Sequence, residues 1–456
     1  MGIKFLKISS VILFFLQATS VFSQQTQKTD EPAPLIPVVK LGENVQVKFG
    51  GFVRAEYYFD SRETVGAVDD LFSFFPENVK KDPNSGDDLN AVFRNNLSSQ
   101  ATRFNALFTG PDVWKAKSSS FLEFDFTGGV AGVGTSGAGT STGITNAVGL
   151  RLRHAWMKLS WAKGDLLVGK TWNPLSDIPF PSVIGLNTGI PFRPFGRGDQ
   201  VRYTWKPNST INVLAAAFFQ SEHKSFIFSD AANTTTGISN CVDTRTNPIP
   251  DMHLQIHFKT PSLFAGIISE YKIVKPATQT TGTGGIFNAN TTISSYALGA
   301  FADYKKNLFN VKASGVYGEN LSELFQQGGY AVKTLDAVTG AKTYTASNSV
   351  TYWLNITYGN KLMAGLFAGY QKNLGFNDNI LTAANGGAFL GRWQNVDHIY
   401  RVGPSLKYSI GRLVLAAEVE YNVAGYGTID YSNRGKVINS NDVSGVRGTL
   451  ATTFLF

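Results

Sequence analysis

Apolar and polar side chains alternate along most of the chain from Val45 onward. The segment 45–60 shows the pattern most clearly, because its odd positions are apolar or glycine and its even positions include Lys48, Arg54, Glu56 and Asp60. Successive side chains of a β-strand point to opposite faces. A segment of this kind is therefore predicted to be a strand with one apolar face and one polar face.

The same alternation predicts sixteen strands. They lie at residues 45–60, 97–109, 119–127, 149–160, 164–172, 200–206, 210–221, 251–259, 263–274, 294–305, 307–318, 350–358, 361–373, 399–409, 412–423 and 443–456.

The connections between these strands alternate strictly between long and short. The long ones fall at 61–96, 128–148, 173–199, 222–250, 275–293, 319–349, 374–398 and 424–442, and the short ones at 110–118, 162–163, 207–209, 260–262, 305–307, 359–360 and 410–411. Outer-membrane barrels combine short periplasmic turns with long external loops. We therefore predict an all-β fold, a transmembrane antiparallel β-barrel of sixteen strands with both termini on the periplasmic side.

The composition supports this prediction. Only 16% of the residues are charged, against about 25% in ordinary globular domains, while 13% are aromatic and the mean hydropathy is −0.06. No run of about 20 apolar residues is present, which excludes a bundle of membrane-spanning helices. Aromatic residues gather at predicted strand ends, and the chain itself ends in Phe456. The alternative is a secreted all-β protein made of two sandwiches or a propeller.

The N-terminus predicts export. Lys4 and Lys7 precede a short apolar run, so residues 1–23 are predicted to be a signal peptide. Residues 24–44 form a proline-rich periplasmic segment, and 45–456 form the barrel, which we expect in the outer membrane of a Gram-negative bacterium. The single cysteine, Cys241, excludes a disulfide framework and lies far from any lipid-anchoring position. The sequence predicts no metal site and no cofactor.

Charged residues on the polar faces would line the barrel, where thirteen basic positions stand against nine acidic ones. A basic wall is expected from Arg103, Arg151, Arg153 and Arg202, with an acidic side opposite or above it. Fixed arginines select carboxylates or phosphates by charge and geometry. The alternative is that many of these charges pair across neighbouring strands. The predicted pore-lining set is Arg54, Arg103, Arg151, Arg153, Lys170, Arg193, Arg197, Arg202, Glu123, Asp125, Glu418 and Glu420.

The connection 173–199 is the predicted constriction. It contains five prolines, which stiffen a loop, and Arg193 and Arg197 lie near its end. A stiff loop that folds inward would narrow the pore and present these two arginines to a solute. The alternative is that the loop caps a rim or lines a subunit contact.

Two stretches carry a family resemblance, Gly169-Lys-Thr-Trp172 and Arg197-Gly-Asp-Gln-Val-Arg-Tyr-Thr204. Here the chain resembles the DcaP-like outer-membrane porin family. The resemblance implies a sixteen-stranded, trimeric porin for small anions, particularly dicarboxylates, with Lys170, Arg202 and the loop arginines at the constriction. The chain differs from the family pattern in its short, proline-rich N-terminal segment and in Gly198-Asp199, where a proline is expected.

The sequence therefore predicts a porin, and not an enzyme, for passive diffusion of small hydrophilic solutes across an outer membrane. Its expected partners are outer-membrane lipid, small anions such as carboxylates, and two further copies of the chain in a homotrimer, with no nucleic acid. One alternative is a non-porin barrel of an uptake or secretion complex. Another is an outer-membrane hydrolase, for which the five histidines are available.

Overall fold

A computed structural model describes residues 38–456 except 43, 69, 129–148, 229–237 and 240–245. The predicted signal peptide, the proline-rich segment up to residue 37 and Cys241 lie outside the described residues. The chain divides into two units, 1–34 and 35–456.

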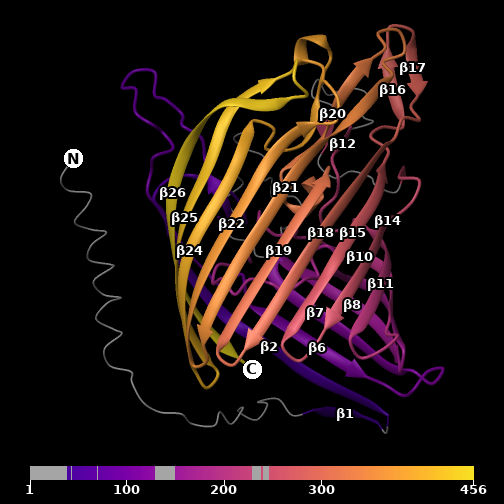
Figure 1. The fold of residues 1–456 in the computed structure, drawn as a ribbon, viewed down its shortest axis with the longest axis vertical. Helices are drawn as coiled ribbons and strands as arrows, with labels where there is room; N and C mark the ends of the chain where they lie inside the picture. Colours follow the sequence, from indigo (N-terminus) through magenta and orange to yellow (C-terminus); the bar gives the residue numbers. More distant parts are fainter. Residues whose placement is uncertain (1–37, 43, 69, 129–148, 229–237, 240–245) are drawn as a thin grey trace. The chain divides into compact units, whose positions relative to one another are not determined.

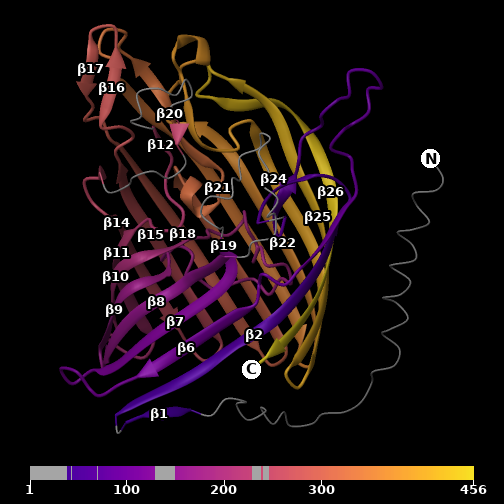
Figure 2. The same ribbon diagram turned by 180° about the vertical axis from the view of Figure 1, so that it is seen from behind.

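Sixteen long strands form a closed antiparallel barrel, each paired with the next along the chain (Figures 1 and 2). The last strand pairs with the first through Phe52 to Asp60 and Arg447 to Leu455, which closes the sheet. This confirms the predicted fold class. The strands are β2 (Val45–Asp60), β6 (Arg103–Thr109), β7 (Lys117–Gly128), β8 (Gly149–Trp161), β9 (Gly164–Trp172), β10 (Arg197–Trp205), β11 (Ile211–Phe219), β14 (Asp251–Lys259), β15 (Leu263–Val274), β18 (Ile293–Lys306), β19 (Phe309–Glu319), β21 (Lys342–Gly359), β22 (Leu362–Phe376), β24 (Val396–Ile410), β25 (Leu413–Asp430) and β26 (Lys436–Leu455).

Several strands differ in length from the prediction. β25 and β26 continue to Asp430 and from Lys436, so most of the predicted connection 424–442 belongs to a tall hairpin. The predicted strand 97–109 is interrupted, and its first part is β5 (Arg94–Ser98), which pairs with the upper half of β2. The hydroxyl of Thr102 accepts a bond from the backbone N–H of Arg54 at this interruption, 3.1 Å away.

The long connections carry small sheets of their own. These are β3 (Thr64–Ala67) with β4 (Phe72–Pro76), β12 (Ile227–Phe228) with β13 (Ile238–Ser239), and β16 (Gln279–Gly282) with β17 (Gly285–Asn288). β20 (Gly328–Leu335) pairs with β21 and β23 (Phe389–Arg392), and β1 (Val39–Leu41) pairs with the start of β2. Two short 3-10 helices lie at Ser322–Leu324 and Ala383–Asn385. No helix among the described residues is long and apolar enough to cross a membrane.

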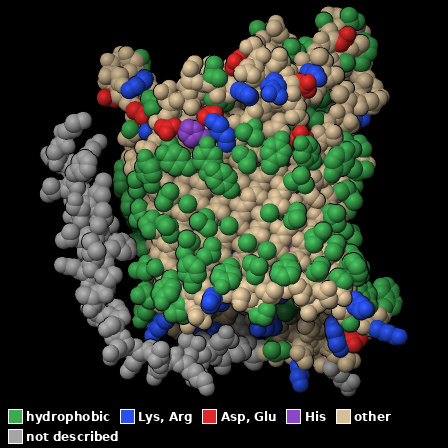
Figure 3. All heavy atoms as spheres, in the orientation of Figure 1, with side chains coloured by type: hydrophobic (Ala, Val, Ile, Leu, Met, Phe, Trp, Pro, Cys, Tyr) green, Lys and Arg blue, Asp and Glu red, His purple; other side chains and the backbone are tan. Residues whose placement is uncertain are grey.

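Side chains alternate between the outside and the inside of the barrel wall. On β14, Met252, Leu254, Ile256 and Phe258 are each about half exposed, whereas the residues between them are buried. Outward-facing apolar side chains form a broad hydrophobic belt across the face of the wall seen in Figure 3. An outer-membrane barrel presents such a belt to lipid.

Candidate functional site

The connection between β9 and β10 leaves the wall and lies inside the barrel. Its Leu175, Ile190 and Phe192 are at most 1% exposed. The amide side chain of Asn355 on β21 accepts a bond from the backbone N–H of Ser182, and Lys312 on β19 donates to the carbonyl of Phe180 at 2.9 Å. The loop therefore crosses the lumen and is attached to strands distant from its own.

Three predicted pore-lining residues hold the tip of this loop. Glu418 accepts bonds from the backbone N–H groups of Ile184 and Gly185, at 2.7 and 3.2 Å. Glu420 accepts one from the side chain of Asn187, and Arg54 donates to the carbonyl of Ile184. These three charged side chains therefore anchor the loop to the barrel wall. They fix the position of the loop inside the lumen.

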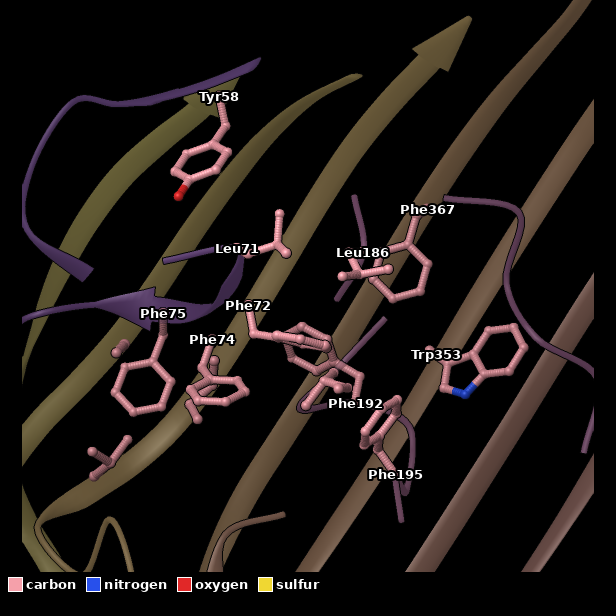
Figure 4. Close-up of a cluster of buried hydrophobic side chains, with 14 of the residues drawn as sticks. Tyr58, Leu71, Phe72, Phe74, Phe75, Leu186, Phe192, Phe195, Trp353 and Phe367 are labelled. Atoms are coloured by element: carbon pink, nitrogen blue, oxygen red, sulfur yellow. The ribbon is translucent and has the colours of Figure 1, made fainter. Parts of the chain in front are cut away.

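A packed apolar cluster fills another part of the lumen (Figure 4). Phe72, Phe74 and Phe75 of the β3–β4 hairpin contribute to it, together with Phe192 and Phe195 of the β9–β10 loop. The charged strand faces do not indicate such a dry apolar cluster inside the barrel. The long loops bring their own apolar side chains into the lumen, and strand periodicity does not reveal them.

The predicted acidic residues of β7 lie beside the arginines of β8, not opposite them. Arg153 bonds to Glu123 at 2.6 Å and to Asp125 at 2.8 Å, and Arg151 bonds to Asp125 at 2.7 Å. The expected separation of basic and acidic walls is therefore wrong for these four residues. The register pairs Asp125 with Arg151, and a shift in the register brings Arg153 beside Glu123. This part of the wall is therefore a paired network, the alternative that the sequence left open.

Three further predicted arginines are buried and do not face a solute as expected. Arg193 lies with its guanidinium carbon 3.5 Å from the ring centre of Phe180 and donates to the carbonyl of Ser176. Arg197 pairs with Glu222 at 2.6 Å. Arg202 is 8% exposed and pairs with Asp177 within the loop. These arginines stabilise the folded loop through ion pairs and cation–π contacts.

The predicted place of Lys170 in the lumen is also wrong. Lys170 is paired in register with Asp199, which lies two residues from the exposed Val201 on the same face of β10. Arg202 and Gln200, on the other face, are the residues that point inward. Lys170 therefore lies on the outer face of the wall.

A pocket of about 280 Å³ opens on the inner wall between β6, β7, β8, β9 and the inward loop. We call it the inner-wall pocket. It is lined by Arg103, Phe121, Glu123, Arg153, His154, Trp156, Thr171, Trp172 and Phe180.

Arg103 differs from the other arginines of the pocket region. Among the described residues it pairs with no carboxylate, and its buried Nε has no hydrogen-bond partner. Its guanidinium lies 5.4 Å from the ring centre of Phe52. Because a buried donor without a partner is costly, this guanidinium is suited to receive an anionic group from a solute.

Six lining residues of this pocket were not predicted: Phe121, His154, Trp156, Thr171, Trp172 and Phe180. The alternation on β7 could have indicated Phe121, since it shares a face with Glu123. His154 and Trp156 could not be placed in this way, because the register shifts at Arg153 and brings both Arg153 and His154 inside. Within the described part of the chain, no three His, Cys, Asp or Glu side chains are placed to hold a metal ion.

Comparison with solved structures identifies the fold. The chain is similar to the outer membrane channel DcaP of Acinetobacter baumannii, with 17% identity and a TM-score of 0.62 over 92% of this chain and 100% of that one. It is also similar to OmpT, an outer membrane protein of Vibrio cholerae, with 10% identity and a TM-score of 0.52 over the same shares of the two chains. The resemblance to DcaP-like porins is thus confirmed in the fold. No family model and no curated protein matches the chain.

Proposed function

We propose that this protein is an outer-membrane porin through which small hydrophilic solutes diffuse, with a preference for anions and with dicarboxylates as the favoured class. The closed barrel, its hydrophobic belt and the loop inside the lumen support a passive channel. The fold shared with the DcaP channel supports the same role.

The unpaired Arg103 is the observation that supports anion preference best. It lines the inner-wall pocket together with the ion-paired Arg153, and each guanidinium lies by an aromatic ring, that of Phe52 at 5.4 Å for Arg103 and that of Trp172 at 5.9 Å for Arg153. Arginine binds carboxylates through two parallel hydrogen bonds. A small dicarboxylate fits this arrangement, since one carboxylate can bind Arg103 while the other remains in water.

The proposal is tested by replacing Arg103. In planar bilayers, Arg103→Gln is expected to lower the ratio of anion to cation permeability about sevenfold, because one charge acting through water at roughly 7 Å favours an anion and disfavours a cation by about 0.6 kcal/mol each. Block of the current by a dicarboxylate such as succinate should weaken in parallel. The matched control is Arg434→Gln, which removes the same charge from an exposed external turn. Equal selectivity in both variants would contradict the role given to Arg103.

We also propose that three copies of the chain form a homotrimer, as the resemblance to DcaP-like porins implies. The mass of the detergent-solubilised particle, measured by light scattering, should correspond to three chains. A particle with the mass of one chain would contradict this part of the proposal and leave the channel itself untouched.

A specific observation favours a second candidate, a barrel that serves as a closed component of a larger complex. The apolar cluster inside the lumen joins two loops and reduces the space for a solute. This candidate predicts no stepwise conductance in a bilayer and stable co-purification with another protein, the opposite of the result expected for a porin.

A further inference from the structure

Basic side chains lie in or directly beside every short connection of the barrel. Taken with the two strand residues on either side, the seven connections contain nine Lys or Arg residues and only two acidic residues, Asp112 and Asp165. We call the nine residues the basic collar: Lys115, Lys117, Lys163, Lys206, Lys259, Lys305, Lys306, Lys361 and Arg412.

The opposite end of the barrel has a different charge balance. The described part of the first long connection, 61–93, contains six acidic residues and three basic ones. This long connection therefore lacks the positive excess of the short ones, so that excess does not simply reflect the net charge of +8 of the whole chain.

Most lysines of the collar have no acidic partner. Lys117 pairs with Asp112 at 2.9 Å, and Lys206 pairs with Asp165 at 2.6 Å. The other six lysines form no ion pair with any described residue, and all six are exposed. A ring of unpaired ammonium groups repels itself, so it is suited to bind an external anion.

The collar lies next to the aromatic border of the hydrophobic belt. Trp205 directly precedes Lys206, Tyr304 directly precedes Lys305, and Tyr358 lies three residues before Lys361. These rings are 49%, 39% and 62% exposed on the outer face. Aromatic girdles of this kind mark the two interfaces between membrane and water.

The depth of the collar matches that of lipid head groups. A strand tilted by about 40° rises roughly 2.5 Å per residue along the barrel axis, so the collar lies within about 10 Å of the aromatic border. Lys361 itself contacts that border, with its Nζ 5.7 Å from the ring centre of Tyr408. Lys and Arg side chains line the lower edge of the belt in Figure 3.

We infer that the basic collar binds the head groups of anionic phospholipids in the periplasmic leaflet. The ammonium groups donate hydrogen bonds to phosphate oxygens, while the neighbouring aromatic rings pack against the upper part of the acyl chains. This inference rests on the outer-membrane location in the proposed function. It goes beyond that function, because it assigns a lipid class to surface residues that take no part in solute passage.

The tryptophans of the chain provide a probe at the collar. Trp114, Trp161 and Trp205 lie in or next to its connections, and Trp114 and Trp205 are 79% and 49% exposed. Quenching by phospholipids with brominated acyl chains reports which lipid surrounds these side chains. Mixed vesicles of phosphatidylglycerol and phosphatidylcholine, with one or the other brominated, give the relative binding constant of the two lipids.

The wild-type protein is expected to prefer phosphatidylglycerol. In Lys259→Gln/Lys306→Gln/Lys361→Gln the relative binding constant should fall at least about fivefold, the factor that corresponds to one lysine near an anionic lipid surface. The control Lys80→Gln/Lys81→Gln/Lys333→Gln removes three exposed lysines from the long connections and should keep the wild-type value.

Two results would overturn the inference: a collar variant with the wild-type lipid preference, or a control variant that loses as much. Ion conductance measured in the same vesicles separates this inference from the proposed function. A wild-type protein that conducts anions but shows no lipid preference contradicts the inference alone. A wild-type protein that prefers phosphatidylglycerol without conducting supports the inference and contradicts the proposed function.

Discussion

Individual arginines in this barrel have different roles, and their partners decide which role each one has. Arg153 is 3% exposed and bonds to Glu123 and Asp125, so it is part of the wall. Arg103, one strand further along the sheet from β7, has no such partner and faces the inner-wall pocket. For binding an anionic solute, the number of inner-face arginines without an ion pair therefore matters more than the total number of basic residues on that face.

A double-mutant cycle tests the structural role of Arg153. Arg153→Gln leaves the partly buried carboxylate of Glu123 without its closest partner, which should lower the free energy of unfolding by about 3 kcal/mol. Glu123→Gln in the same chain removes the stranded charge, so the double variant should recover most of the loss. Urea unfolding in detergent provides the measurement. Strictly additive effects of the two changes would show that the pair does not contribute.

At the scale of elements, the β9–β10 loop is positioned by close packing as well as by hydrogen bonds. Gly369 on β22 faces the ring of Phe192, and a Cβ atom at this glycine would overlap that ring. The hydroxyl of Thr351 on β21 also donates to the carbonyl of Phe192, at 2.9 Å. The wall strands therefore fix how far the loop extends across the lumen.

Adding one methyl group should displace the loop. Gly369→Ala is expected to cost about 1–3 kcal/mol of stability through overpacking and to change the single-channel conductance, because Phe192 must move. The control is Gly315→Ala on β19, where the new methyl group would meet no atom closer than 3.7 Å. If the conductance of Gly369→Ala equals that of the wild type, the position of the loop does not set the width of the passage.

For the whole molecule, the sequence predicted the barrel because its strands follow a repeat of two residues and its connections alternate in length. All sixteen predicted strands have counterparts in the closed sheet. The interior could not be predicted as well, because the partners of its residues come from distant parts of the chain. Glu418 binds Ile184, and Arg401 donates to the carbonyls of Ser73 and Phe74. Lys170 was misplaced because its charge was taken to indicate the polar face, although Lys170 shares its strand face with the apolar Leu166 and Val168.

The reversal potential of the wild-type channel tests the central proposal most directly. It is measured in a planar bilayer with different potassium chloride concentrations on the two sides. An anion-preferring porin gives stepwise conductance and a reversal potential with the sign of the chloride equilibrium potential. A reversal potential with the sign of the potassium equilibrium potential, or the absence of stepwise conductance, would contradict the account.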